Sequence, residues 1–369
     1  MKNKISNKNN IKKNYIIELF RLVGFFMVVG THVKSISSSK TDVLLACMFA
    51  DGVAIFWFIT GAFLFDKKSY KQKLNKLFQR IIKPLVFYTI IYYLFYDYAM
   101  GTCTLKNSVM HPFNVIFNDL RHTFLTFNSS THLWYLYVYI LVIICYPVLK
   151  KISELIKPSN YKKTLIILLL VLIYNDVTSN TFLSLSHGGI TGVIAASFFI
   201  YLGHIVYKIK DELVNNKKNT IIAIILLLVL LVIRFVININ VLNLDPNNRF
   251  FFRWHTSFGF INTICLYIII SHFCRYIKKD IFIAFINKLG SLTYRGYIIH
   301  IFIMAICDNM GLRNNLIGLT EKISYSHFIY QILYTIIIFS ISLLVSYIIE
   351  KIKAILINLT NRNYNKEKI

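Results

Sequence analysis

The stretch YIIELFRLVGFFMVVGTHV, residues 15–33, is apolar over most of its length and follows Lys12 and Lys13. A transmembrane helix needs about 20 mainly apolar residues, so this stretch predicts a helix that crosses a bilayer. It lacks the small-residue cleavage site that ends a secretory signal peptide. We therefore expect the segment to be retained as a signal anchor.

Nine more apolar stretches of comparable length follow the first one, and together they predict an all-α, polytopic membrane protein with a bundle of about ten transmembrane helices. The connections are too short to fold alone. We expect one membrane domain over residues 15–354, with basic cytoplasmic tails at 1–14 and 355–369. The expected spans lie near residues 15–33, 43–65, 81–99, 132–149, 164–180, 188–207, 219–238, 254–274, 290–307 and 327–350.

Lys and Arg residues alternate between the two ends of these spans. Of the 41 in the chain, 30 lie in the two tails and in every second connection, eight lie in the other connections, and three lie within spans. Short basic segments stay in the cytoplasm, so both termini are expected there. The same pattern accounts for the net charge of +25, and it predicts membrane lipid, rather than nucleic acid, as the partner of the basic segments.

The six cysteines are scattered along the chain without CxxC or Cys/His ligand spacing. Neither a metal site nor a disulfide framework is therefore predicted. The chain also has no Gly-rich phosphate loop and no GxSxG motif. Its chemistry must come from side chains in or near the spans.

Ionisable side chains inside a span are costly, and they indicate functional sites unless they snorkel to the interface. Arg21 and His32 lie eleven residues apart in the first span. On an α-helix this spacing brings them to within about 20° of one face and separates them by about 16 Å along the axis. We expect Arg21 toward the cytoplasmic side and His32 toward the outer side of one channel. The alternative is that Arg21 snorkels and His32 lies at the outer interface.

Arg80 and Lys83 open the third span, three residues apart and so on one face of a helix. Positive-inside flanking accounts for them simply. With Arg21 they could instead form a cationic pocket at the inner mouth, which would suit a phosphorylated ligand.

Five short motifs follow one another along the chain, namely Arg21-x10-His32, Phe56-Trp57-Phe58-Ile59-Thr60-Gly61, Arg80-x-x-Lys83-Pro84, His132-Leu133-Trp134-Tyr135-Leu136 and Tyr297-Ile298-Ile299-His300. Their order and spacing, together with the ten-span pattern, resemble the membrane acyltransferase-3 family over nearly the whole chain. Two positions depart from the family's pattern. Thr60 stands where serine is usual but keeps the hydroxyl, and Lys83 stands where arginine is common and offers a point charge instead of a bidentate fork.

The resemblance implies an O-acyltransferase of the plasma membrane. It would take an acyl group, most often acetyl from acetyl-CoA, from the cytoplasm and transfer it to a hydroxyl of an extracytoplasmic cell-envelope glycan. It also implies that His32 is the essential histidine and that Arg21, Arg80 and Lys83 hold acyl-CoA, with no metal. A neutral imidazole can take the proton from the acceptor hydroxyl, or it can carry the acyl group itself. Both routes stay open.

Several further residues are candidates for the site, and each also has an ordinary structural explanation. Asp51 could orient or charge-stabilise His32, or it could be an exposed carboxylate at a loop end. Arg234 could contact an anionic acceptor or be an ordinary loop charge. The resemblance further implies that the substrate site is lined by Thr60, His132, Trp134 and His300. For His132 and Trp134 the alternative is an aromatic belt at the outer interface, and for His300 it is a hydrogen bond to a neighbouring helix.

A non-enzymatic glycan exporter or amino-acid transporter is the alternative function, because ionisable groups that face a channel fit both. Transporters are often built from two repeated halves with interrupted helices around a midplane site. The sequence has no internal repeat and no paired Gly/Pro-interrupted spans. This difference favours the enzyme.

Overall fold

The structure is a computed structural model of the 369-residue chain, and it describes residues 2–33, 40–92, 94, 131–178, 182–185, 189–240, 253–320 and 326–366. All regular structure in these ranges is helical. The chain divides into two compact units. The first comprises Met1–Val33 and Lys279–Ile369, and the second comprises Lys34–Lys278.

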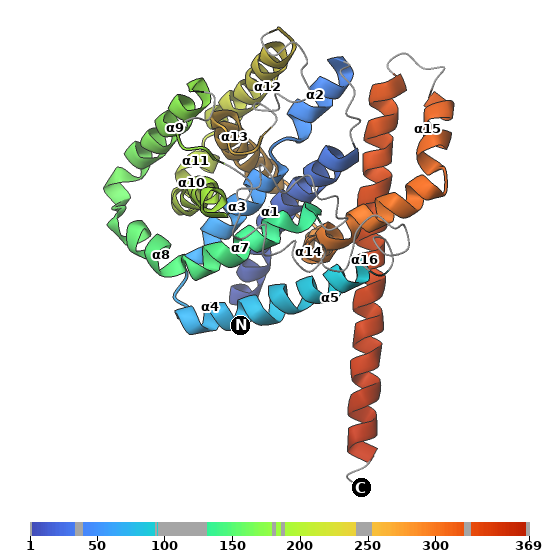
Figure 1. The fold of residues 1–369 in the computed structure, drawn as a ribbon. Coiled ribbons are helices and arrows are strands. Elements are labelled where there is room, and N and C mark those ends of the chain that lie inside the picture. The colour runs from blue at the N-terminus through green and yellow to red at the C-terminus, as the bar shows by residue number, and fades with distance from the viewer. Residues whose placement is uncertain are drawn as a thin grey trace. The chain divides into compact units, whose positions relative to one another are not determined.

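The first unit packs α1 against α14 and α16 (Figure 1). The ring centroid of Phe25 on α1 lies 5.2 Å from that of Phe339 on α16. On α14, Gly296 lies so close to Phe25 that an added Cβ would come within 2.9 Å of the ring. The three long helices therefore meet around a fully buried Phe25. The helices of this unit are α1 (Lys2–Val33), α14 (Asp280–Asn309), α15 (Leu312–Thr320) and α16 (Ser326–Lys366).

The second unit contains the other helices, and within it α3 packs along α10 and α12 packs along α13. In chain order they are α2 (Lys40–Phe49), α3 (Gly52–Leu64), α4 (Tyr70–Leu77), the π-helix η1 (Phe78–Ile82), α5 (Lys83–Tyr92), the 3-10 helix η3 (Thr131–Leu133), α7 (Trp134–Ile144), α8 (Tyr146–Leu155), the 3-10 helix η4 (Pro158–Asn160), α9 (Tyr161–Val177), α10 (Gly189–Lys208), α11 (Lys210–Asn215), α12 (Lys217–Asn240) and α13 (Ser257–Cys274).

Two glycines allow α3 and α10 to touch backbone to backbone. A Cβ added at Gly61 on α3 would lie 1.9 Å from the carbonyl oxygen of Ile200, and one added at Gly203 on α10 would lie 2.0 Å from the carbonyl oxygen of Phe58. Small residues at such crossings are a general device for packing helices in membranes. The glycine that ends the Phe56–Gly61 motif therefore has a structural role at this crossing.

We expect Gly61→Ala to destabilise the protein by about 1–3 kcal/mol or more, because the added methyl group meets backbone that no rotamer change can move. Thermal unfolding in detergent measures the effect. Gly318→Ala is the matched control, since a Cβ there meets nothing within 4 Å. Equal unfolding temperatures for the two variants would contradict this account of the crossing.

Among the described residues, seven helices are long and apolar enough to cross a membrane, or eight if the bent pair α7 and α8 counts as one span. The chain is thus a multi-pass membrane protein, while the total of ten spans and the cytoplasmic termini stay predictions. The seven are Tyr15–Val33, Lys40–Leu64, Gly189–Lys208, Lys217–Asn240, Ser257–Cys274, Asp280–Asn309 and His327–Ile355.

Three of the expected spans are not among these seven helices, and two of them extend beyond the described residues. The one at 81–99 extends beyond the described residues, which stop at residue 92 apart from residue 94. The one at 164–180 also ends outside them, and its described part lies in α9, which has 17 residues. Such a helix is about 26 Å long, somewhat less than the roughly 30 Å of a hydrocarbon core.

The expected span at 132–149 is not one straight helix. It divides at Cys145 into α7 and α8, whose axes differ by 66°. Pro147 is the second residue of α8 and has no N–H to donate back into α7, and its ring clashes with the preceding turn. The proline thus explains the bend.

Candidate functional site

Arg21 forms an ion pair on its own helix. Its Nη1 donates to both carboxylate oxygens of Glu18, one turn earlier, at 2.7 and 2.6 Å. Gly290 on α14 makes room for this pair, because a Cβ there would lie 2.3 Å from Glu18 Oε2. The Arg21 side chain keeps 29% of its surface exposed. The guanidinium is therefore held in place and still accessible to an anion, although Glu18 offsets part of its charge.

His32 lies in the last turn of α1 beside a second histidine of the same unit. The ring centroids of His32 and His300 are 5.2 Å apart, with the planes inclined at 52°. His32 is half-buried, whereas His300 is fully buried in the C-terminal third of α14. Because α1 runs without a break from Lys2 to Val33, Arg21 and His32 belong to one continuous helix, as expected.

An arginine of α15 holds the end of α1. Arg313 Nη1 donates to the carbonyl oxygen of Val33 at 3.2 Å, directly after His32 in the chain. Asp308 fixes this guanidinium with two hydrogen bonds, at 2.9 and 3.1 Å. Tyr334 donates its hydroxyl to Asp308 and lies with its ring 4.7 Å from the guanidinium. A cation at a helix C-terminus is favourable, and here it anchors the turn that carries His32.

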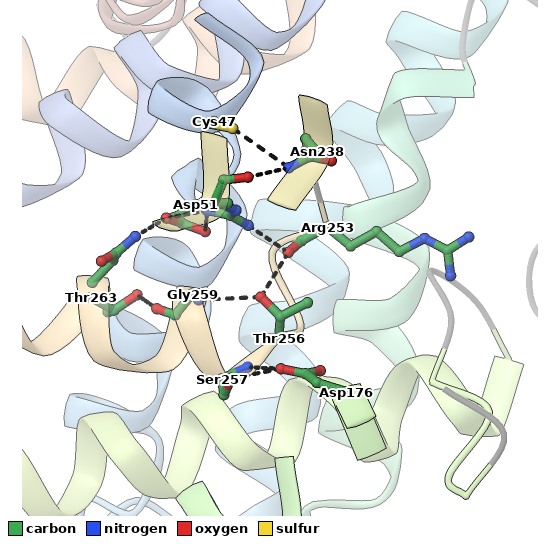
Figure 2. Close-up of polar contacts among 11 residues, drawn as sticks. Cys47, Asp51, Asp176, Asn238, Arg253, Thr256, Ser257, Gly259 and Thr263 are labelled. Carbon is green, nitrogen blue, oxygen red and sulfur yellow. Dashed lines mark hydrogen bonds and ion pairs between the residues drawn. The ribbon is translucent and has the colours of Figure 1, made fainter. Parts of the chain in front are cut away.

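Asp51, at the break between α2 and α3, is the centre of a buried polar cluster in the second unit (Figure 2). Arg234 Nη1 lies 3.0 Å from each of its carboxylate oxygens, and Asn262 donates to Oδ2 at 2.8 Å. The side chains of Asp51 and Arg234 are only 2% and 0% exposed. The two alternatives, an exposed carboxylate and an ordinary loop charge, are therefore wrong.

Backbone groups complete this cluster. Arg234 Nη2 donates to the carbonyl oxygen of Arg253 at 3.0 Å, while the Arg253 guanidinium itself points away from Asp51 (Figure 2). Nearby, Asp176 accepts hydrogen bonds from the backbone N–H and the hydroxyl of Ser257, at 2.8 and 2.6 Å. Both contacts lie at the start of α13, where a carboxylate is favourable.

The three tryptophans of the chain lie together in the second unit. Trp254 is 6.5 Å from Trp57 and 6.2 Å from Trp134, measured between ring centroids, and the latter pair is stacked. All three are buried. The Trp134 of the fourth-span motif is thus part of an aromatic core rather than a belt facing lipid.

Two other predicted substrate residues also have partners in this unit. The Thr60 hydroxyl donates to the carbonyl oxygen of Phe56 at 2.9 Å, within its own helix. His132 is buried, with Nε2 3.5 Å from the Tyr92 hydroxyl. Their expected contacts with a substrate stay predictions.

Arg80 and Lys83 are both exposed at a widened turn of helix. Pro84 cannot donate to the carbonyl of Arg80, and the Lys83 N–H instead bonds the carbonyl of Phe78, five residues back. Lys83 Nζ lies 5.3 Å from the centre of the Phe78 ring. Since η1 is a π-helix, the α-helical spacing that we assumed for Arg80 and Lys83 does not hold, and their predicted common face needs correction.

More cations gather beside Arg80 than the motif includes. Contact with Lys68, followed by slight desolvation and the positive charges of Lys68 and Arg80, lowers the pKa of Lys76. Burial raises the pKa of Asp66, but hydrogen bonds from Lys68 and Lys73 outweigh it and lower that pKa to about 2. Crowded cations create a positive potential that suits an anion. In the sequence, Lys68 and Lys76 fit the positive-inside pattern like the other basic residues of this connection, and nothing in it marks them as part of a site.

The first unit thus brings together His32, His300 and Arg313, which binds the end of α1. The second unit contains the other candidates, namely Asp51, Thr60, Arg80, Lys83, His132 and Trp134. The expected action of Asp51 on His32 stays a prediction. An accessible imidazole beside a second one can move a proton. In the described part of the chain, no group of three or more His, Cys, Asp or Glu residues could hold a metal ion.

Comparison with known proteins identifies one family. Residues 14–351 match the acyltransferase domain of acyltransferase family 3, which is almost the whole chain. No curated protein and no solved structure is significantly similar to the chain.

Proposed function

Because this chain belongs to the membrane acyltransferase-3 family, we propose that it transfers acetyl groups from cytoplasmic acetyl-CoA to hydroxyls of an extracytoplasmic cell-envelope glycan, as an O-acetyltransferase of the plasma membrane. The observation that carries this proposal is the placement of His32. It is a half-buried imidazole beside His300 of α14, in a last helical turn that Arg313 of α15 anchors, on the same helix as Arg21.

In the proposed reaction His32 acts as the general base. Its imidazole takes the proton from an acceptor hydroxyl while the hydroxyl oxygen forms a bond to the acetyl carbon. The bond from that carbon to sulfur breaks, and the proton on His32 passes to the coenzyme A thiolate. The products are an acetyl ester and free coenzyme A, and His32 returns to its neutral form.

The phosphates of acetyl-CoA are bound, in this proposal, by Arg21, Arg80 and Lys83. This role is supported by the accessibility of the three side chains: Arg80 and Lys83 are exposed, and Arg21 is partly exposed. The neighbouring cations Lys68 and Lys76 add to the positive potential near Arg80. Arginine and lysine bind phosphate through charge-assisted hydrogen bonds, and these are stronger than neutral ones.

We expect Arg80→Ala and Lys83→Ala each to weaken the binding of acetyl-CoA by about 1.5–3 kcal/mol, through loss of one charge-assisted hydrogen bond. Equilibrium binding to the purified protein in detergent, at low and high salt, measures this loss. Lys163→Ala is the control, since it removes the same charge from an exposed position in another basic connection. If all three variants bind like the wild type, Arg80 and Lys83 are topology signals only.

Mass spectrometry of envelope polymers tests the proposed function itself. Polymers from cells that produce the protein should carry acetyl esters that polymers from deletion cells lack. The same glycan in both strains without any difference in acetylation would contradict the proposal. Loss of the whole glycan from the cell surface would instead favour the exporter.

A further inference from the structure

The contact between His32 and His300 joins two imidazoles inside the first unit. At a centroid separation of 5.2 Å the two rings make no direct hydrogen bond, and one water molecule can join a nitrogen of each ring. The planes are inclined at 52°, so the rings do not stack. This arrangement suits a bridge of one water molecule between the ring edges.

The backbone fixes the tautomer of neutral His300. Its Nδ1 lies 2.6 Å from the carbonyl oxygen of Tyr297. A carbonyl oxygen can only accept, so Nδ1 must carry the hydrogen. In the neutral ring Nε2 then holds the lone pair and is an acceptor. The carbonyl of Tyr297, one turn earlier in α14, thus fixes the tautomer of neutral His300.

The surroundings of His300 also fix the orientation of its ring. The Phe25 ring meets it edge to face, with centroids 6.1 Å apart and planes at 84°. The Tyr297 ring lies at 5.8 Å on its own helix. With no exposed surface, His300 cannot swing into solvent. It is a rigid acceptor beside a half-buried His32.

We propose that His300 is a positioning residue for His32: one water molecule accepts a hydrogen bond from an N–H of the His32 ring and donates one to Nε2 of His300. This bridge fixes the tautomer of His32 and directs its other nitrogen toward the acceptor hydroxyl. When that nitrogen takes the proton, the bridge to His300 stays with the imidazolium. The inference rests on the proposed function, and it gives His300 the part that the sequence suggested for Asp51.

Two amide substitutions separate this role from a merely structural one. In His300→Asn the amide nitrogen lies near the place of Nδ1, so the variant keeps the donor for the Tyr297 carbonyl and loses the acceptor. In His300→Gln the longer side chain can place its amide oxygen near Nε2, so an acceptor for the bridging water molecule remains. If His300 has only a structural role, the variant needs a donor in place of Nδ1 for the Tyr297 carbonyl. If His300 positions His32, the variant needs an acceptor in place of Nε2.

The test measures acetyl transfer from labelled acetyl-CoA to the native acceptor in membrane vesicles that contain each full-length variant. We expect His300→Asn to lower kcat by about 100-fold or more, with KM for acetyl-CoA changed less than about twofold. His300→Gln should be at least about tenfold faster than His300→Asn. Size-exclusion profiles in detergent show that each variant is folded.

The inference is overturned if folded His300→Asn is as fast as His300→Gln or faster, which includes both variants being fully active or both inactive. Failure of the proposed function looks different. There the wild type transfers no acetyl group, or His32→Ala transfers as well as the wild type. Either result overturns the inference together with the proposed function, because no catalytic His32 then remains for His300 to position.

Discussion

Replacing His32 with alanine is expected to abolish acetylation of the envelope glycan while the protein stays folded and inserted. Loss of a general base typically lowers a rate by about 10²–10⁴-fold. His32 occupies the last turn of α1, and Arg313 still holds the Val33 carbonyl after the substitution. The effect therefore falls on chemistry rather than on the helix. The acetyl ester content of polymers from deletion cells that express the variant measures it.

The control for this experiment is His204→Ala, which removes a half-buried histidine of α10 that contacts the Phe65 ring. This variant should keep acetyl transfer, because His204 has no part in the proposed chemistry. Wild-type ester content in cells with His32→Ala would remove His32 from the mechanism.

Breaking the pair of Asp51 and Arg234 is expected to cost about 3–5 kcal/mol of stability, because each single substitution leaves a charge without its ionic partner. Asp51→Asn leaves Arg234 buried with its charge, and Arg234→Met leaves the carboxylate with Asn262 as its remaining side-chain donor among the hydrogen bonds described. Unfolding in detergent and the yield of folded protein measure the loss. Wild-type stability of both single variants would contradict this account.

The double variant Asp51→Leu with Arg234→Met tests what else Asp51 does. Replacing both members of a buried ion pair by apolar residues is often neutral or stabilising, so this variant should be more stable than either single one. If it also transfers acetyl groups, Asp51 has a structural role only. A stable but inactive double variant would support the role in orienting His32 that the sequence suggests.

The sequence predicted the helical membrane class, because apolar runs and basic flanks depend only on local composition. It also singled out Arg21 and His32 correctly as residues of one continuous helix. It could not predict the contacts of Arg234 with Asp51, 183 residues away, or of Arg313 with Val33, 280 residues away. Such pairings depend on helix packing, and a charge in a sequence does not indicate its partner.

Local departures from a straight helix were predictable in part. Pro147 and Pro84 are visible in the sequence, and each removes a backbone donor. The bend of 66° after α7 and the π-helix at Arg80 are their consequences. Both segments are predicted as regular spans because their hydropathy is uniform, and hydropathy carries no information about a missing N–H.

The sidedness of acetyl transfer tests the central claim most directly. Inside-out vesicles from cells that produce the protein receive acetyl-CoA labelled in the acetyl group. The account predicts alkali-labile label on a glycan in the vesicle lumen, protected from an added esterase until the vesicles are opened, and no such label with His32→Ala. Equal label in vesicles without the protein, or label only when acetyl-CoA is offered to the outer face of right-side-out vesicles, would contradict it.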